Sequence, residues 1–169
     1  MTGIEDTDWS RLYRELEKPL YNVVFRWLWD VESSQDIVQE AFLRCWRKRA
    51  YVEQDGFKAL VFRTALNLAK NEQRRKRLWQ FVTLWPVEQP ENQQAIEADF
   101  LRKPLRQAVD ALPEQLKTVL MLSEMAGLSY REIAEVTGVK EGTVGSRRHR
   151  ALTELQEELK ARGVVWSDE

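Results

Sequence analysis

Residues 127–159, GLSYREIAEVTGVKEGTVGSRRHRALTELQEEL, carry the clearest structural signal in this chain. Ser129 stands three residues before Glu132, which is the spacing of a capping box and predicts the start of a helix. Gly138 predicts the end of that helix, and a second helical pattern begins near Lys140 and Glu141. Two helices joined this tightly must cross at a steep angle. This is the helix-turn-helix layout, whose second helix can lie in the major groove of DNA.

The second helix of this motif has an apolar stripe and a polar front half. Its predicted buried stripe consists of Val144, Ala151, Leu152, Leu155 and Leu159. The polar residues that could face DNA are Thr143, Ser146, Arg147, His149 and Arg150. Arginine reads guanine through a bidentate hydrogen bond, so the pattern favours DNA binding over the alternative of a solvated helical hairpin. The motif alone does not say which kind of DNA-binding protein this is.

The composition is typical of a soluble, folded protein. The chain has 169 residues, of which 43% are hydrophobic and 31% are charged, and its net charge is −1, which argues against a disordered chain or a membrane protein. The single cysteine, Cys45, cannot close an internal disulfide, and we expect it to be reduced and buried. The longest apolar run, 20–29, is interrupted by Arg26, so we expect no membrane insertion. Because no signal peptide precedes the first helix, we expect a cytoplasmic protein.

An acidic segment without basic residues separates the chain into two parts of mixed charge. Residues 1–79 hold 15 basic and 12 acidic side chains and residues 102–169 hold 11 of each, whereas residues 80–101 hold 4 acidic side chains and no basic ones. This middle segment contains two prolines and no sustained helical stripe before Ala95, which is typical of a linker. We therefore predict an all-α protein with small helical domains at 8–78 and 101–162, an acidic linker at 79–100 and a tail at 163–169.

The first domain should begin with a helix that proline interrupts. Asp8 can cap this helix, Pro19 should break or kink it, and a second helix should follow over 20–29. Ser33 and Asp36 form another capping signature. After it, apolar residues recur at helical spacing and predict a buried stripe of Ile37, Val38, Ala41, Phe42, Cys45 and Trp46.

The opposite face of this third helix is polar except for one leucine. It holds Asp36, Gln39, Glu40, Leu43 and Arg44. A single exposed leucine is common and carries no meaning by itself. A leucine surrounded by acids, an amide and an arginine also has the composition of a protein-binding patch, and on these residues alone both interpretations stay open.

The next helix should span FKALVFRTALNLAKNEQRRKR, residues 57–77, with a buried stripe of Leu60, Val61, Thr64, Ala65 and Leu68. Other faces of this helix carry amides and basic side chains, namely Arg63, Asn67, Lys70, Asn71, Arg74 and Arg75. Amides can bond base edges and cations can hold phosphates, so this face favours nucleic-acid binding. The alternative is a solvated helix end where cations are stabilising in their own right, but that alternative gives the asparagines no role.

Two further helices should separate the linker from the helix-turn-helix. The first has the apolar residues Leu101, Leu105, Ala108, Val109 and Leu112. The second should start at Pro113 and continue up to Gly127, with Leu116, Val119 and Leu120 buried. With the helix-turn-helix, they predict a compact four-helix domain.

Three segments in this order resemble a known family. They are SSQDIVQEAFLRCW (33–46), FKALVFRTALNLAKNEQRRKR (57–77) and ALPEQLKTVLMLSEMAGLSYREIAEVTGVKEGTVGSRRHRAL (111–152), with the acidic segment between the last two. Together they resemble a bacterial RNA polymerase sigma factor of the extracytoplasmic-function group, group IV of the sigma-70 family. The resemblance covers about residues 10–160. Its first segment is the most specific, because a helix-turn-helix alone fits many regulators.

The resemblance implies a role for each surface and names the partners. The first domain would be sigma region 2-like, and its polar face around Leu43 would grip core RNA polymerase. The face with Asn67 and Asn71 would melt the minus-ten promoter element and hold its non-template strand, beside a pocket for a flipped base at about 51–56. The helix-turn-helix would be sigma region 4-like and would read the minus-thirty-five duplex. The acidic linker would thread toward the polymerase active-site channel, and an anti-sigma protein would hold the factor inactive.

Three positions depart from the family pattern. The family commonly has Lys or Arg directly after its GTV, where this chain has Gly145. Arg148 stands on the inner stripe where many members have an apolar residue, and Ala59 replaces a frequent Trp. Helix capping is also weak at Lys140. These differences bear on promoter preference and local packing.

The residue inventory does not favour an enzyme. The chain has one His and one Cys, and we see no phosphate-binding glycine loop and no cluster with metal-ligand spacing, so we expect no catalysis, no cofactor and no metal. Two other interpretations stay open. A helix-turn-helix regulator with a helical effector or dimerisation domain predicts a palindromic site. A helical adaptor that binds only protein predicts no salt-dependent affinity for DNA.

Overall fold

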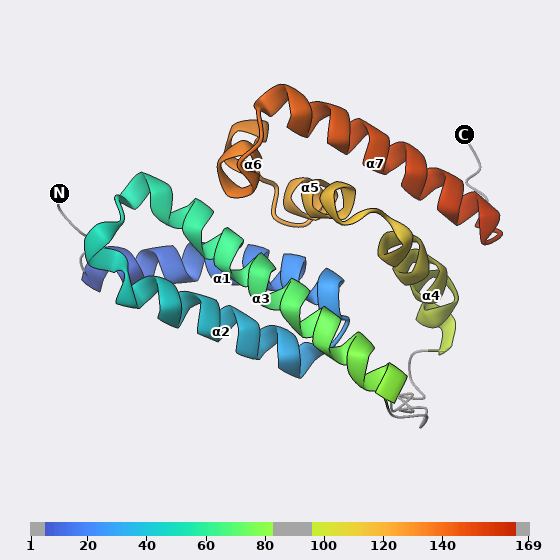
Figure 1. Cartoon of the computed structure of the whole chain (residues 1–169), viewed down its shortest axis with the longest axis horizontal. Coiled ribbons are helices and arrows are strands. Elements are labelled where there is room, and N and C mark those ends of the chain that lie inside the picture. The colour runs from blue at the N-terminus through green and yellow to red at the C-terminus, as the bar shows by residue number, and fades with distance from the viewer. Residues whose placement is uncertain (1–5, 83–95, 165–169) are drawn as a thin grey trace.

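The computed structural model describes residues 6–82 and 96–164, and every regular element in those two ranges is a helix. The all-α class predicted from the sequence is therefore confirmed. The elements in chain order, drawn in Figure 1, are α1 (Asp6–Leu28), α2 (Val31–Arg47), the short 3-10 helix η1 (Arg49–Tyr51), α3 (Gln54–Val82), α4 (Ile96–Ala111), α5 (Glu114–Glu124), α6 (Tyr130–Thr137) and α7 (Glu141–Ala161).

Helices α1, α2 and α3 pack against one another and form the N-terminal half (Figure 1). Val23 of α1, Phe42 of α2 and Phe62 of α3 lie in their shared core and are almost fully buried. The Trp9 ring packs on this core, with its centroid 5.8 Å from that of Phe42 and 5.3 Å from that of Phe57. Burying a side chain of this size stabilises the fold by about 1.5–3 kcal/mol. The bundle therefore depends on its apolar stripes more than on helix propensity.

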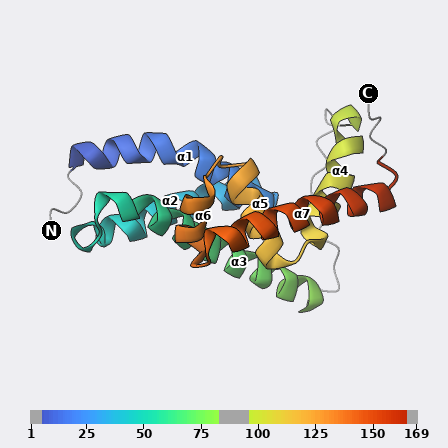
Figure 2. The ribbon, with the colours of Figure 1, turned by 90° about the horizontal axis from the view of Figure 1, so that it is seen from above.

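Helix α5 is at the centre of the C-terminal half, where α6 and α7 pack against it and α4 packs against α7. Figure 2 shows α7 crossing this half from α6 to α4. Leu120, Ile133 and Val144 bring α5, α6 and α7 together in a fully buried core. Ser129 caps α6 in a capping box and Gly138 ends it with φ at 74°, so both predicted boundaries of this helix are confirmed.

The predicted break in the first helix is wrong. Helix α1 continues through Pro19 as far as Leu28. Proline removes one helical hydrogen bond and crowds the preceding turn. Leu16 and Leu20, on either side of the proline, are nevertheless 5% and 0% exposed. Packing of this apolar stripe against α2 and α3 therefore outweighs the local cost of the proline.

The predicted start of the next helix is also wrong. Helix α2 begins at Val31, and its N-cap is Asp30, whose Oδ1 accepts a hydrogen bond from the Ser33 backbone N–H at 2.7 Å. Ser33 therefore lies inside the first turn and does not cap the helix. The chain turns earlier than predicted because Trp29 adopts a left-handed conformation with φ at 53°.

Helices extend into both ends of the predicted linker 79–100, since α3 runs to Val82 and α4 begins at Ile96. The acidic residues between these helices, and residues 165–169 of the predicted tail, lie outside the described residues. Within α7, the predicted burial of Leu152 is wrong because this side chain is 38% exposed. The buried residues of α7 are Val144, Ala151 and Leu159, as predicted.

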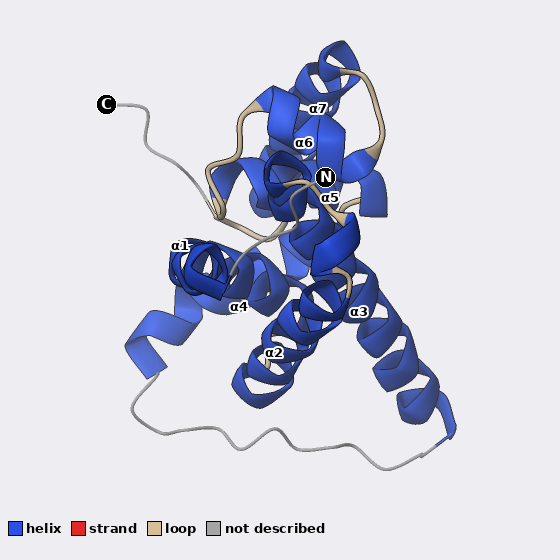
Figure 3. Cartoon of the chain, turned by 90° about the vertical axis from the view of Figure 1, so that its left-hand side faces the viewer, coloured by secondary structure: helices blue, strands red, loops and turns tan. Residues whose placement is uncertain are grey.

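The two halves are in contact. Helix α6 lies against α3, and α5 reaches α1. Figure 3 shows α6 and α7 lying over the group formed by α1, α2 and α3. Buried apolar side chains from both halves form one connected cluster, which includes Trp27 of α1 and Leu116 of α5. This contact between the halves determines which of the surfaces predicted to bind DNA or polymerase remain open to a partner.

Candidate nucleic-acid interface

The residues predicted to contact a protein partner lie on the outer face of α2, and we call them the α2 patch: Asp36, Gln39, Glu40, Leu43 and Arg44. Leu43 is 52% exposed, whereas its neighbour Phe42 on the inner face is 2% exposed. Arg44 Nε donates a hydrogen bond to Glu40 Oε1 at 2.5 Å. The α2 patch is therefore an apolar side chain on an open surface, bordered by a paired acid and base.

The residues predicted to read duplex DNA lie on the first half of α7, and we call them the α7 front: Thr143, Ser146, Arg147, His149 and Arg150. Ser146, His149 and Arg150 are exposed, and Thr143 and Arg147 are half-buried. Arg150 Nε lies 2.7 Å from Glu154 Oε1 on the same helix. This ion pair holds the guanidinium along the helix surface in the absence of DNA.

One of the unusual residues of the helix-turn-helix has a structural explanation. A Cβ added at Gly145 would lie 3.4 Å from Tyr130 Cε2 of α6, which is ordinary van der Waals contact, so nothing in the structure explains the glycine. Arg148 Nε donates hydrogen bonds to Ser123 Oγ at 2.9 Å and to Glu124 Oε1 at 2.8 Å. Arg148 therefore joins α7 to α5, which accounts for an arginine on the inner stripe. Lys140 makes no side-chain cap to α7, as predicted.

The residues predicted to hold melted DNA lie on α3, and we call them the α3 face: Arg63, Asn67, Lys70, Asn71, Arg74 and Arg75. All are exposed except Lys70, which is half-buried. The C-terminal half contacts this face. Arg63 Nε donates to the backbone oxygen of Val136 at 3.1 Å, and Arg63 Nη2 donates to that of Glu135 at 2.5 Å.

Lysine and arginine side chains of α3 also pair with carboxylates of the C-terminal half. Glu114, in the first turn of α5, lies 3.2 Å from Lys70 Nζ and 3.5 Å from Arg74 Nη2. Lys58 precedes Arg63 on α3, and its Nζ lies 2.7 Å from Oε1 of Glu132 in α6. Burial acts to raise the pKa of Glu132, but hydrogen bonds from Lys58 and Ser129 outweigh it and hold the pKa below its ordinary value.

A cavity of about 580 Å³ lies between the halves and brings together residues assigned to different DNA elements. Arg63, Asn67 and Lys70 of the α3 face and Arg147 of the α7 front all line it. A second cavity of about 370 Å³ lies between α2 and α3, beside Asn67 and Asn71. Sequence reasoning missed the first cavity because its walls come from residues far apart in the chain.

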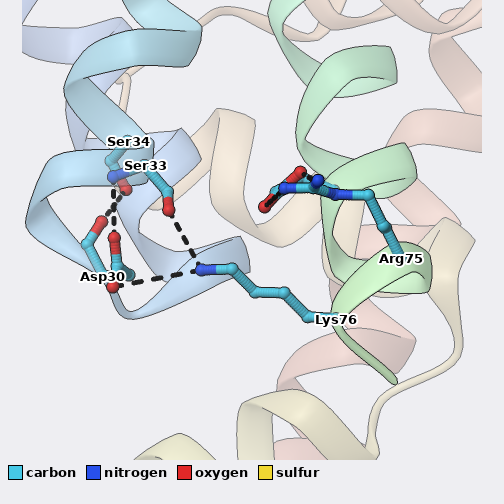
Figure 4. A network of polar contacts seen from close by, with 6 residues as sticks. Asp30, Ser33, Ser34, Arg75 and Lys76 are labelled. Carbon is cyan, nitrogen blue, oxygen red and sulfur yellow. Dashed lines mark hydrogen bonds and ion pairs between the residues drawn. The ribbon is translucent and has the colours of Figure 1, made fainter. Parts of the chain in front are cut away.

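The basic end of α3 is partly occupied by contacts within the N-terminal half. Figure 4 shows Lys76 reaching the turn before α2, where Nζ lies 3.0 Å from Ser33 Oγ and 3.9 Å from Asp30 Oδ2. Arg75 pairs with Glu72 on its own helix, at 2.8 Å. Hydrogen bonds from Ser33 lower the pKa of Asp30, with a smaller contribution from Lys76. Lys76 therefore stabilises the turn between α1 and α2 rather than standing free for phosphate.

Sequence reasoning also missed a buried lysine between the halves. Lys117 of α5 is 2% exposed, and its Nζ lies 2.7 Å from Asp110 Oδ1 and 4.3 Å from the centre of the Trp27 ring of α1. Burial lowers the pKa of Lys117, although Asp110 opposes this shift. Asp110 also accepts a hydrogen bond from Trp29 Nε1 at 3.4 Å. A lysine within the apolar run 116–122 was the signal available in the sequence.

The described part of the chain offers no group of three or more His, Cys, Asp or Glu side chains that could hold a metal ion. None of the helices in residues 6–82 and 96–164 is long and apolar enough to cross a membrane. Cys45 is buried, as predicted, and burial raises the pKa of its thiol.

Two family models match the chain, one in each half. The model described as Sigma-70 region 2 matches residues 12–78, and the model described as Sigma-70, region 4 matches residues 102–155. The matched segments include the α2 patch and the α3 face in the first case and the α7 front in the second.

Proteins similar to this chain carry related descriptions. The RNA polymerase sigma-H factor of Pseudomonas aeruginosa is 31% identical, over 88% of this chain and 84% of that protein. The ECF RNA polymerase sigma factor SigE of Mycolicibacterium smegmatis is 30% identical over 89% of this chain, which spans 61% of that longer protein. Among solved structures, CnrH in complex with the cytosolic domain of CnrY has a TM-score of 0.72 at 21% identity, covering 93% of this chain and 90% of CnrH. This likeness is one of fold.

Proposed function

The chain belongs to the extracytoplasmic-function group of the sigma-70 family, and on that basis we propose how its surfaces act in transcription initiation. The factor recruits core RNA polymerase to specific promoters, helps to open the DNA and leaves catalysis to the polymerase. Its work is binding alone, in the compartment where polymerase and promoter DNA are found, which is the cytoplasm.

The α2 patch is the surface that binds core polymerase. The observation that carries this assignment is the 52% exposure of Leu43 between charged side chains on an otherwise amphipathic helix. An exposed leucine gains free energy when a partner covers it, and the surrounding charges orient the partner and exclude wrong ones. The patch lies on the segment that matches Sigma-70 region 2.

The α3 face holds the melted non-template strand of the minus-ten element. Asn67 and Asn71 can bond the edges of unpaired bases, and Arg63, Lys70, Arg74 and Arg75 can hold the phosphates. The two asparagines lie one helical turn apart, and both line the 370 Å³ cavity between α2 and α3. None of residues 51–56, where the pocket for a flipped base was expected, lines this cavity. We propose that an extruded base is received in the cavity between α2 and α3 instead.

The α7 front reads the minus-thirty-five duplex. Ser146, His149 and Arg150 are exposed on the second helix of the helix-turn-helix, in the position from which such helices reach base edges. With Gly145 in place of the cation common in the family, Arg147 and Arg150 carry most of the positive charge that this helix can offer to DNA. We propose that the acidic linker predicted at 79–100 threads toward the polymerase active-site channel.

An anti-sigma protein is the expected regulator of this factor. CnrH, whose fold this chain shares, was solved in complex with the cytosolic domain of CnrY. A partner of that kind would cover the α2 patch or the contact between the halves and so keep the factor from polymerase.

Binding to bacterial core polymerase tests the proposal. The purified chain should bind core polymerase and support start-site-specific transcripts. Leu43→Arg should weaken core binding roughly tenfold or more, because it places a charge in the centre of the contact. Val31→Arg is the matched control, since Val31 is 55% exposed on the same helix and lies outside the α2 patch.

Two outcomes would count against this assignment. Equal affinity of the wild-type chain and Leu43→Arg for polymerase would remove the α2 patch as the contact. A chain that binds intact duplex DNA as a dimer and never binds polymerase would support the alternative, a helix-turn-helix regulator, which leaves the α2 patch without a role.

A further inference from the structure

The cavity of about 580 Å³ between the halves is lined by an excess of positive charge. Three basic side chains, those of Arg63, Lys70 and Arg147, line it against one carboxylate, that of Glu114. Its volume lies within the range of small-molecule sites, about 300–1,000 Å³. A concave surface lined mainly by charges of one sign raises the local concentration of the opposite ion. The cavity therefore has the size and the charge to take a small anion.

Arg147 is the basic side chain of this cavity that has no partner. It is half-buried, and its guanidinium makes no hydrogen bond or ion pair with any other residue that the structure describes. Arg63, by contrast, donates to two backbone oxygens at the end of α6, and Lys70 Nζ lies 3.2 Å from Glu114. A guanidinium has five N–H donors, and removing it from water without a partner costs free energy. A phosphate can accept two of these hydrogen bonds at once, which makes it the natural partner.

The rest of the lining suits a nucleoside better than a bare phosphate. The side-chain amides of Asn67 and Gln115 line the cavity and make no hydrogen bond to another described residue. An amide carries a donor and an acceptor side by side, which matches the pattern on the edge of a base. Leu66, Val136 and Val139 add aliphatic surface on which a base or a ribose can pack.

We propose that the cavity between the halves is a binding site for a nucleoside diphosphate or triphosphate. Its phosphates bind Arg147 and lie within the positive field of Arg63 and Lys70. Its base is held by the amides of Asn67 and Gln115. Since the lining comes from α3, α5, α6 and α7, the bound nucleotide contacts both halves at once.

This site would give the factor a small-molecule input. Arg147 belongs to the α7 front, and Arg63, Asn67 and Lys70 belong to the α3 face, so nucleotide and promoter DNA use the same side chains. Each ligand therefore weakens the binding of the other, and by the same factor. This competition rests on the roles proposed above for the two surfaces, whereas binding of the nucleotide does not.

Titration calorimetry on the full chain at low salt tests the site. The probes are the four common ribonucleoside triphosphates, with inorganic tripolyphosphate as the control that has the phosphates but no base or ribose. The tightest of the four nucleotides should bind at least tenfold more tightly than tripolyphosphate, because only the nucleotide reaches the amides and the aliphatic wall.

Two pairs of variants distinguish the cavity from the DNA-binding surfaces as a whole. Arg147→Ala should weaken nucleotide binding roughly tenfold or more, since it removes a charge-assisted contact. Arg150→Ala, on the same helix but outside the lining, should change it by less than about twofold. Asn67→Ala should weaken it roughly three- to tenfold. Its control is Asn71→Ala, because Asn71 lines only the cavity between α2 and α3.

The fold should survive Arg147→Ala, because this side chain has no partner to lose, and far-UV ellipticity checks it. Absence of nucleotide binding by the wild-type chain, or equal losses in Arg147→Ala and Arg150→Ala, would overturn the site. Equal affinity for nucleotide and tripolyphosphate would overturn the assignment of a nucleoside. None of these readouts needs polymerase or a promoter. A chain that binds nucleotide as described but never binds core polymerase would instead refute the function proposed for the α2 patch.

Discussion

Asp30 stabilises the turn between α1 and α2 through both its side chain and its backbone. Its Oδ1 accepts from the Ser33 N–H at 2.7 Å, its backbone oxygen accepts from Ser34 Oγ at 2.5 Å, and Lys76 Nζ lies 3.9 Å from Oδ2. Asp30→Ala removes the side-chain cap and should lower the free energy of unfolding by about 1 kcal/mol. Asp36→Ala, an exposed position inside the same helix, should change it by less than about 0.5 kcal/mol.

The loss in Asp30→Ala should depend on pH in a defined direction. Hydrogen bonds from Ser33 lower the pKa of Asp30 in the folded chain. A carboxyl with a lowered folded-state pKa stabilises the fold above its unfolded pKa of about 3.9, and this stabilisation is lost as the pH falls through the folded value. Urea unfolding at pH 7 and pH 5 should therefore give the same difference between variant and wild type, and pH 3 a smaller one. A difference that grows on acidification would contradict the cap.

Residue patterns predicted the helix-turn-helix boundaries well because their signals are local. Ser129 and Glu132 begin α6 and Gly138 ends it through contacts within about one helical turn, and both boundaries lie where they were predicted. Asp30 was missed because Ser33 and Asp36 offered an equally good local pattern. The left-handed Trp29 that makes Asp30 the cap has no signature in the sequence.

The continuity of α1 shows packing prevailing over local propensity. Pro19 cannot donate a hydrogen bond, so the backbone oxygen of Glu15 loses its helical partner. The helix persists because Leu16, Leu20 and Val23 bury one stripe against α2 and α3. Burial of each such side chain supplies about 1.5–3 kcal/mol, which together exceeds the roughly 3 kcal/mol that a helical proline costs.

Pro19→Ala should therefore stabilise the protein. Alanine restores the missing hydrogen bond and removes the clash, and the free energy of unfolding should rise by about 1–3 kcal/mol. Urea unfolding measures the change. Asn22→Ala, in the same helix, is the control and should change it by no more than about 0.7 kcal/mol. If Pro19→Ala destabilised the chain, the helix would have to depend on the proline, contrary to this account.

The docking of the two halves could not be predicted from the sequence. Arg63 and Val136, or Lys70 and Glu114, are far apart in the chain, and their periodicity shows only that they are polar positions of their own helices. The sequence did reveal which faces are polar and which are buried. The pairing of the α3 face with the end of α6 depends on how the whole chain folds, and local sequence patterns carry no information about that.

Unfolding should reveal whether the halves behave as one unit. Four of the seven tryptophans, Trp9, Trp27, Trp46 and Trp79, lie in α1–α3, and Trp29 lies in the turn between α1 and α2. Trp85 and Trp166 lie outside the described residues, and α4–α7 contain no tryptophan. Fluorescence therefore reports mainly the N-terminal half, while far-UV ellipticity reports all helices. The buried cluster continues from Trp27 to Leu116 across the contact. At low salt both signals should therefore change at one urea concentration in the wild-type chain.

Glu114→Lys should separate the two signals. Weakening the contact by 1–2 kcal/mol, the size expected for lost ion pairs and a new repulsion, should move the two midpoints apart by roughly 0.5–1 M urea. Glu32→Lys should keep them together, because its charge change lies outside the contact. Two separate transitions in the wild-type chain would mean that the halves fold independently and that the contact adds little. Coincident transitions in Glu114→Lys would mean that the apolar cluster alone couples the halves, with no need for the ion pairs of the α3 face.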